Sequence, residues 1–225
     1  YLIERDFIEV ETPVLSNHVG GAAAKPFIKL HNAMKQDMYM RIAPELYLKQ
    51  LVIGGLDRVF EIGKNFRNES IDTTNNPEFT ACEFYMAGAD YYQLIEMTQE
   101  MLVDMVTQIR GSAKVEWMGN DIDFTLPFKQ IDMMDELQLE VREKLNDETF
   151  ILPDLNSEHA SEEYHNLHTM LGLKPEPPFT LNRLVDNLVG EFVEPKCIQP
   201  TFLLNHPLIM SPLAKPQRLD STKTE

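Results

Sequence analysis

Cysteine is scarce in this sequence. Its 225 residues include 2 cysteines, Cys82 and Cys197, which lie far apart and lack the C-x-x-C spacing of a zinc or redox motif. A disulfide framework and a cysteine zinc site are therefore excluded as organising features. Both thiols are expected to be reduced packing residues.

Basic residues are also few. The 20 Lys and Arg residues stand against 36 Asp and Glu residues, which gives a formal net charge of -16. Phosphate binding is driven by Lys and Arg contacts. The composition therefore argues against the chain acting by itself as a nucleic-acid binder.

Long hydrophobic runs are missing as well. No segment approaches the roughly 18 to 20 apolar residues that a membrane-spanning helix needs, and no secretory signal pattern is present. The hydrophobic content of 43% is typical of a soluble globular protein. The length suffices for one sizeable domain, and we expect a cytoplasmic protein with no membrane partner.

The strongest pattern in the sequence is a pair of strands joined by a polar loop. Residues 57–69 alternate apolar and polar side chains, residues 70–77 are rich in turn-forming residues, and residues 78–86 resume a strand. An antiparallel hairpin would place apolar side chains on one face and a mixed set on the other. The apolar set is Phe60, Ile62 and Phe66, and the mixed set is Arg67, Glu69, Phe79, Glu83 and Tyr85. This is the outline of a small-molecule site, although a half-exposed hairpin with solvated charges fits the pattern equally well.

Two segments before the hairpin contribute further candidates. Pro44 in a first turn and Gly54 at the end predict a helix over residues 44–53, with Glu45 placed to complement the helix dipole. The small-residue segment at residues 20–27 is either a flexible linker or a loop where the backbone can approach a ligand closely.

The remaining pattern mixes helices and strands. Residues 1–6 resemble the end of a helix and residues 7–12 a strand, and Asp90 and Thr180 are expected to cap helices. Further helices are expected near 132–145 and 157–171, a hairpin at 115–124 and a strand at 201–207. His165 and His168 are spaced i, i+3 on one predicted helix, but no carboxylate completes a metal-site signature there.

The hairpin resembles motif 2 of the class II aminoacyl-tRNA synthetases, in the form found in lysyl-tRNA synthetases. The resemblance is carried by Phe66-Arg67-Asn68-Glu69, by Asn76-Pro77-Glu78-Phe79-Thr80 and by Cys82-Glu83-Phe84-Tyr85. Residues 1–13 are similar to motif 1, and residues 188–215 are also similar to the lysyl enzymes.

The resemblance implies a fold class and a domain organisation. The expected fold is α+β, the class II catalytic fold with an antiparallel sheet flanked by helices, incomplete at the C-terminal end. Residues 1–215 would form part of the catalytic domain. Residues 216–225 are polar and unpatterned, so they are expected to be a divergent, disordered tail.

The resemblance also implies a reaction. Lysyl-tRNA synthetases activate lysine with ATP to form lysyl-adenylate, and then transfer the lysyl group to tRNA(Lys). The expected partners of the complete enzyme are lysine, ATP, Mg2+, tRNA(Lys) and a second subunit in a homodimer.

By resemblance, the nucleotide would meet a first set of residues. Arg67 would act catalytically by bridging the lysine carboxylate and the α-phosphate of ATP, Glu69 would accept from the adenine amino group, and Phe79 would stack on adenine. Asn76 matches a loop position that meets the phosphates, and Asn68 and Asn75 complete the set. Asn75 replaces a histidine common in the family, so weaker ATP binding is expected.

Lysine would meet a second set, also by resemblance. Tyr85 would bind the ε-ammonium group, while Glu45, Glu83 and the backbone of Gly21 would hold the α-amino end; Arg67 would meet the carboxylate. Aspartyl and asparaginyl relatives tend to have glutamine where Glu45 stands, so this residue favours lysine.

Several family features lie beyond Lys215. These are a second glutamate for the ε-ammonium, the magnesium ligands and motif 3 with its ATP-binding arginine. We therefore expect little or no ligase activity from this chain alone, and no metal ligands within it. Two alternatives remain: a non-catalytic interaction protein or truncated isoform derived from a lysyl-tRNA synthetase, and a related aspartyl-type or asparaginyl-type ligase.

Overall fold

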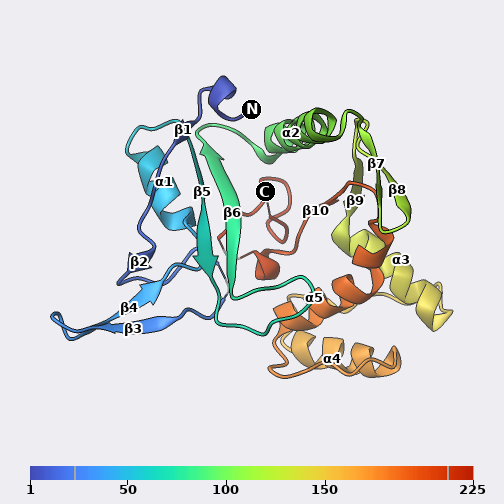
Figure 1. Cartoon of the computed structure of the whole chain (residues 1–225). Helices are drawn as coiled ribbons and strands as arrows, with labels where there is room; N and C mark the ends of the chain where they lie inside the picture. Colours follow the sequence, from blue (N-terminus) through green and yellow to red (C-terminus); the bar gives the residue numbers. More distant parts are fainter. Residues whose placement is uncertain (23, 212, 225) are drawn as a thin grey trace. The chain divides into compact units, whose positions relative to one another are not determined.

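The computed structural model describes residues 1–22, 24–211 and 213–224 (Figure 1). The chain divides into two compact units, Tyr1–Ala89 and Asp90–Glu225, which are called unit 1 and unit 2 below. Ala23 of the small-residue loop, Pro212 and Glu225 lie outside the described residues. Within the described ranges, no helix combines the length and hydrophobicity needed to cross a membrane.

Unit 1 is built on the predicted hairpin. Strand β5 (Arg58–Phe66) pairs antiparallel with β6 (Glu78–Met86), in a register that runs from Arg58 opposite Met86 to Phe66 opposite Glu78. Strand β1 (Ile8–Glu9) pairs parallel with β5 and completes a sheet of order β1-β5-β6. The hairpin prediction is confirmed, while the predicted strand over residues 7–12 is shorter than expected and follows a 3-10 helix at Ile3–Arg5.

The two faces of this hairpin are buried differently from what alternation suggests. Ile62, on the apolar face, is 57% exposed, whereas Glu61, on the opposite face, is 4% exposed and Asn65 is 1% exposed. The polar face is buried because residues 41–53 pack against β5 and β6. The charges of Glu61 and Arg41 are therefore shielded from solvent.

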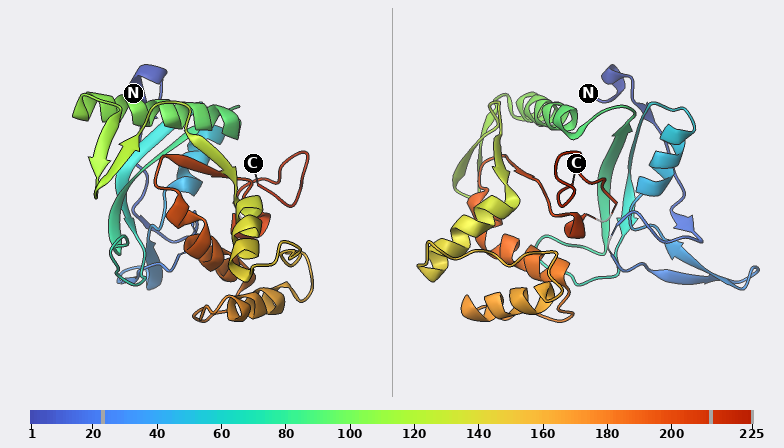
Figure 2. Two further views of the ribbon diagram at one scale, coloured as in Figure 1. Left: turned by 90° about the vertical axis from the view of Figure 1, so that its right-hand side faces the viewer. Right: turned by 180° about the vertical axis from the view of Figure 1, so that it is seen from behind.

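The segment that covers this face contains α1 (Glu45–Ile53), with Pro44 as its N-cap residue and Leu48 fully buried. The helix prediction is confirmed with a start one residue later. Figure 2 shows α1 beside the two long strands of unit 1. Ahead of it, β4 (Gln36–Met40) runs antiparallel between β2 (Leu15–Ser16) and β3 (Ile28–His31).

Unit 2 begins with α2 (Tyr91–Arg110), which Asp90 caps in a capping box with Gln93. Strands β7 (Lys114–Trp117) and β8 (Asn120–Asp123) form a hairpin, and β9 (Lys129–Asp132) pairs parallel with β10 (Thr201–Leu204). Between β9 and β10 lie α3 (Met133–Leu145), α4 (Ala160–Met170), α5 (Leu181–Phe192) and a 3-10 helix at Glu194–Lys196. A further 3-10 helix, Leu208–Met210, follows β10.

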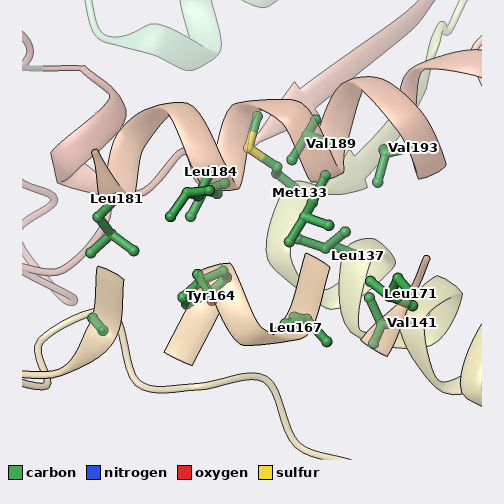
Figure 3. Packing of buried hydrophobic residues seen from close by; sticks show 13 residues of the cluster. Met133, Leu137, Val141, Tyr164, Leu167, Leu171, Leu181, Leu184, Val189 and Val193 are labelled. Atoms are coloured by element: carbon green, nitrogen blue, oxygen red, sulfur yellow. The ribbon is translucent and has the colours of Figure 1, made fainter. Parts of the chain in front are cut away.

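The apolar core of unit 2 is formed by three of these helices. Apolar side chains at helical spacing on α3, α4 and α5 converge, as Figure 3 shows. The fully buried members include Leu137, Val141, Tyr164, Val185 and Leu188, each 0% exposed. Hydrophobic burial therefore accounts for the packing of these helices.

The last residues make contacts within unit 2. The backbone N–H of Leu208 donates to Thr222 O at 2.9 Å, and Pro207 and Lys223 form an antiparallel bridge. Lys223 Nζ also donates to Asp132 Oδ2 at 3.1 Å. The sequence predicts disorder here from polar composition, whereas Gln217, Thr222, Lys223 and Thr224 form hydrogen bonds with other residues of unit 2. The assignment of residues 1–215 to one catalytic domain stays a prediction.

Candidate functional site

Two carboxylates lie close to each other on the buried polar face of unit 1. Glu45 occupies the first turn of α1, and Glu83 points from β6 on the face that α1 covers. The pKa of Glu83 lies above its ordinary value, and burial is the largest cause. The hydrogen bond from Tyr85 lowers this pKa, the negative charge of Glu45 raises it, and the charges of Arg41 and Arg67 lower it. A pair of partly desolvated carboxylates is suited to a ligand that carries an ammonium group.

Tyr85 adds a hydroxyl group to this acidic pair. Its Oη donates to Glu83 Oε2 at 3.3 Å. Burial, together with the charges of Glu45 and Glu83, raises the pKa of Tyr85 well above its ordinary value. The phenol therefore stays protonated at physiological pH and remains a hydrogen-bond donor and acceptor.

One ammonium group of the protein already lies at this place. Lys49, one turn after Glu45 on α1, donates from Nζ to Glu45 Oε1 at 2.5 Å. The same Nζ lies 5.9 Å from the centroid of the Tyr85 ring. Lys49 is not among the residues predicted from sequence, although its i, i+4 spacing from Glu45 indicates the contact.

Arg67 follows β5 and is held beside an aromatic ring. Its backbone N–H donates to Pro77 O at 2.8 Å, and its Cζ lies 5.1 Å from the centroid of the Phe79 ring. The Nε atom is buried and has no hydrogen-bond partner among the residues that the structure describes. A planar guanidinium with an unsatisfied donor fits a carboxylate or phosphate ligand.

The loop between β5 and β6 carries the remaining predicted nucleotide contacts. Asn68 N–H donates to Lys25 O at 2.7 Å, and Lys25 N–H donates to Glu69 Oε1 at 3.4 Å. This ties the end of β5 to the small-residue loop. Asn76 is exposed.

Asn75 is engaged within its own loop. Its Nδ2 donates to Asp72 Oδ2 at 2.7 Å, and its backbone N–H donates to Asp72 Oδ1 at 2.7 Å. These bonds, led by the Asn75 side chain, lower the pKa of Asp72 to about 2. The amide expected to meet phosphate is therefore turned toward Asp72 in this structure.

Gly21 lies against the start of α1. It has φ 92°, a conformation that favours glycine, and a Cβ built there would lie 3.2 Å from Ala43 Cβ and 3.4 Å from Glu45 Cβ. The backbone of Gly21 therefore approaches the start of α1 closely, and its contact with a ligand stays a prediction. Gly21 thus lies beside Glu45.

A buried ion pair beneath these residues was missed by the sequence analysis. Arg41 donates from Nη1 to Glu61 Oε1, and Thr12 Oγ1 donates to Glu61 Oε2 at 2.6 Å. Alternation placed Glu61 on the same face as Glu83, which was the available signal. Its partners come from distant segments and were not predictable from local pattern.

Among the predicted residues, the structure therefore brings Gly21, Glu45, Glu83 and Tyr85 together in one acidic cluster, and places Arg67 against Phe79. Arg67 is near enough to Glu83 to lower its pKa. Asn68, Glu69, Asn75 and Asn76 lie on the exposed loop side. The roles of all these residues stay predictions.

The predicted site residues do not line the two larger cavities of unit 2. Two cavities of about 680 and 610 Å³ lie in unit 2, and neither is lined by a residue of the predicted site. Throughout residues 1–22, 24–211 and 213–224, no three His, Cys, Asp or Glu side chains group as a metal site. Cavity size therefore does not identify the site; the chemistry of its residues does.

Comparison with known proteins identifies the family. The model of the "tRNA synthetases class II (D, K and N)" matches residues 1–225. The chain belongs to this class II synthetase family. The α+β class II fold that the resemblance implies is confirmed.

Individual relatives of this class II chain are lysine-specific by name. It is 47% identical over 234 residues to the "Probable lysine-tRNA ligase, cytoplasmic" of Encephalitozoon cuniculi, with 100% of this chain and 45% of the relative covered. It is 44% identical over 226 residues to the lysine-tRNA ligase of Clostridium botulinum, covering 100% of this chain and 43% of the relative. The lysine-tRNA ligase of Shewanella denitrificans is 43% identical over 217 residues, covering 96% and 42%. The chain therefore spans less than half the length of these relatives.

Proposed function

We propose that unit 1 carries the lysine-binding and part of the ATP-binding surface of a lysine-tRNA ligase. The observation that carries this proposal is that two kinds of site lie in unit 1, on the hairpin and on the start of α1. Glu45, Glu83 and Tyr85 form an acidic group suited to an ammonium ligand, and Arg67 offers an unsatisfied donor beside Phe79. The names of the relatives support lysine over aspartate or asparagine.

The proposed reaction, activation of lysine and its transfer to tRNA(Lys), has two steps. A carboxylate oxygen of lysine attacks the α-phosphorus of ATP, the bond to the β-phosphate oxygen breaks, and pyrophosphate leaves with the electron pair. A terminal ribose hydroxyl of tRNA(Lys) then attacks the lysyl carbonyl, and AMP leaves. The substrate supplies its own nucleophile in the first step, so the protein must align the reactants and stabilise the developing charge.

On the lysine side, the ligand brings two ammonium groups and one carboxylate. Tyr85 binds the ε-ammonium group, while Glu45, Glu83 and the Gly21 backbone hold the α-amino end. Lys49 is already bound to Glu45 at 2.5 Å, so the incoming α-amino group shares or replaces that contact. The α-amino group must share or replace the Lys49 contact because Glu45 has only two carboxylate oxygens.

On the nucleotide side, Arg67 has two tasks. Its guanidinium bridges the lysine carboxylate and the α-phosphate, which reduces the repulsion between these anions as they approach. Phe79 stacks on adenine and Glu69 accepts from the adenine amino group. Asn68, Asn75 and Asn76 lie where the loop would meet the nucleotide, and Asn75 must leave Asp72 to donate to a phosphate.

The complete enzyme needs more than this chain. We place Mg2+, tRNA(Lys) and a second subunit in the complete homodimeric enzyme in the cytoplasm, a location that appears in the name of the Encephalitozoon relative. The chain alone is proposed to bind lysine with little or no ligase turnover, because residues beyond Lys215 are expected to complete the ATP site.

The test compares binding with turnover. Isothermal titration of this chain is expected to detect lysine and not aspartate, and ATP-pyrophosphate exchange with lysine and Mg2+ is expected to be weak or undetectable. Arg67→Ala should weaken binding of a non-hydrolysable lysyl-adenylate analogue by roughly 100-fold, the scale for a lost charged donor. Arg67→Lys, the matched control, keeps the charge without the planar fork and should recover part of that affinity.

Three outcomes would contradict the proposal in different ways. Equal binding of aspartate and lysine would contradict the substrate. Unchanged analogue affinity in Arg67→Ala would contradict the role of Arg67. Robust exchange by the wild-type chain would show that the ATP site is sufficient as it stands.

A further inference from the structure

Two glutamates face each other across the central hairpin of unit 1. Glu61 of β5 is paired in register with Glu83 of β6, so the two side chains lie on the same face of the sheet. Directly opposite residues in an antiparallel pair have Cβ atoms about 4.5 to 5.5 Å apart, and like charges there repel. Such a pair needs a compensating cation or a shared proton.

Glu61 is fully engaged. Arg41 Nη1 donates to its Oε1, and Thr12 Oγ1 donates to its Oε2 at 2.6 Å. The side chains of Arg41 and Glu61 are 4% and 5% exposed, respectively. Both carboxylate oxygens of Glu61 are therefore occupied by groups of the protein.

Arg41 is fixed by further acceptors. Its Nε donates to Lys64 O at 2.8 Å, and its Nη1 also approaches Thr12 O at 3.3 Å. The guanidinium is thus held between the strand that carries Glu61 and the segment that carries Thr12. The position of this cation is therefore set by the protein.

Glu83 is engaged differently from its partner across the strand. It accepts one hydrogen bond from Tyr85, at 3.3 Å to Oε2, and its Oε1 makes none within the described part of the chain. It is also less buried than Glu61. Of the two facing carboxylates, one is bound by the protein and the other is available to a ligand.

We propose that Arg41 and Glu61 form a positioning pair that keeps Glu83 ionised for the ammonium group of the ligand. Arg41 neutralises Glu61, so a second negative charge can exist directly across the strand. This inference rests on the proposed function, because it assigns the charge on Glu83 to ligand binding. Neither Arg41 nor Glu61 needs to touch the ligand.

Gly63 supports this arrangement. It lies two residues after Glu61 on the same face, opposite the small Ala81. A Cβ built at Gly63 would overlap Arg41 Nη2. The absence of a side chain at Gly63 leaves room on this face for the guanidinium that reaches Glu61.

Other titratable and charged groups lie around Glu83. The charges of Glu45, Arg41 and Arg67 and the hydrogen bond from Tyr85 shift its pKa. Glu61 faces it in register on β5, Lys49 is bound to Glu45 on α1, and Cys82 precedes it on β6. Variants that change only Arg41 and Glu61 leave the remaining groups in place. Their effects can therefore be compared with one another.

The experiment measures the titration of the Glu83 carboxyl carbon by NMR in the ligand-free chain, with the signal assigned by Glu83→Gln. Arg41→Gln leaves two facing carboxylates without their cation and should raise the pKa of Glu83 by about one unit or more. Glu61→Gln removes the facing negative charge, leaves Arg41 free to attract Glu83, and should lower that pKa. In the double variant the two changes should largely cancel.

Lysine affinity as a function of pH provides the second readout. The acid limb of the profile should move to higher pH in Arg41→Gln and to lower pH in Glu61→Gln. On that limb, a shift of about one unit changes affinity about tenfold. A merely structural role would instead weaken binding at every pH without moving the limb.

Two controls keep the test decisive. Arg41→Gln removes one partner of a buried pair and can fail to fold; Glu61→Gln, the double variant and the charge-preserving Arg41→Lys then carry the test. Arg41→Lys should titrate near the wild type. A Glu83 pKa that is the same in wild type and Glu61→Gln overturns the inference, whereas absence of lysine binding in the wild-type chain contradicts the proposed function.

Discussion

The two units of this chain are stabilised by different interactions. In unit 2, apolar side chains from α3, α4 and α5 form a buried cluster, and its members recur at helical spacing. In unit 1, the face of the hairpin against α1 buries Glu61, Asn65 and Arg41 beside Val59 and Leu48. One unit is organised by hydrophobic packing, the other by a buried polar network next to its candidate site.

The difference shows that a charged binding site can require buried polar groups that hydrophobic packing does not supply. Burying charge is costly unless each group is paired and hydrogen-bonded, so the network in unit 1 is poorly suited to stability alone. It does supply fixed charges of both signs at the surface where a zwitterionic ligand is proposed to bind. The apolar cluster in unit 2 consists of hydrophobic side chains and supplies no fixed charges.

The largest expected effect comes from opening the core of unit 2. Leu188→Ala removes a fully buried side chain from α5 and should cost about 2 to 5 kcal/mol of local unfolding free energy. Hydrogen exchange followed by mass spectrometry should show faster exchange in α4 and α5. Leu139→Ala, at a position 57% exposed on α3, is the matched control and should have little effect.

Peptides from β5 and β6 are the internal reference in this experiment. If hydrogen exchange in these peptides becomes as fast as in α4 and α5, the two units unfold together. The two units would then not be stabilised independently. Unchanged exchange in α5 would contradict the importance of the apolar cluster itself.

A smaller change in the free energy of unfolding is expected when a polar contact of unit 2 is removed. Asp132 caps α3 and accepts from Asn205 and Lys223. Burial raises its pKa, but the hydrogen bonds and the Lys223 charge outweigh burial, so the folded pKa lies below the ordinary value. Its stabilising contribution is therefore present above the unfolded pKa and is lost as pH falls through the folded one.

Asp132→Asn tests this dependence. Asparagine caps helices about as well as aspartate, so the loss at pH 7 should be about 1 kcal/mol or less, mainly from the contact with Lys223. Urea unfolding between about pH 5 and 2 should show a flatter acid decline than in the wild type. Asp186→Asn, an exposed position on α5, should leave the decline unchanged, and an equally steep decline in Asp132→Asn would disprove the linkage.

The smallest effect is expected in the loop of unit 1. Asn75→His removes the amide that donates to Asp72 and offers phosphate a side chain that can carry positive charge. We expect ATP to bind a few-fold more tightly, with a larger gain near pH 6 than near pH 8, because protonated histidine attracts phosphate more strongly. Titration calorimetry measures this, and ATP affinity equal to that of the wild type would refute it.

Asp72→Asn is the companion control for this loop. It weakens the acceptor that holds Asn75 without adding a cation. If Asp72→Asn raised ATP affinity as much as Asn75→His, the gain would come from release of the loop and not from the charge of histidine.

The local features of the candidate site were predictable from sequence. Alternation at residues 57–69 and 78–86 with a turn-rich segment between them specifies a hairpin, because both its period and its loop are local properties. Pro44 and Gly54 bounded α1 to within one residue. The resemblance then supplied candidate roles for Arg67, Glu83 and Tyr85, which alternation alone does not provide.

Only the tertiary structure decided which face of that hairpin is buried. By composition, Ile62 belongs inside and Glu61 outside, and the structure has the reverse. Glu61 is buried because Arg41 and Thr12, from segments 20 and 49 residues away along the chain, satisfy both of its oxygens. The sequence by itself determined the strands and their spacing; the partners that make a buried carboxylate tolerable are long-range, and no local pattern records them.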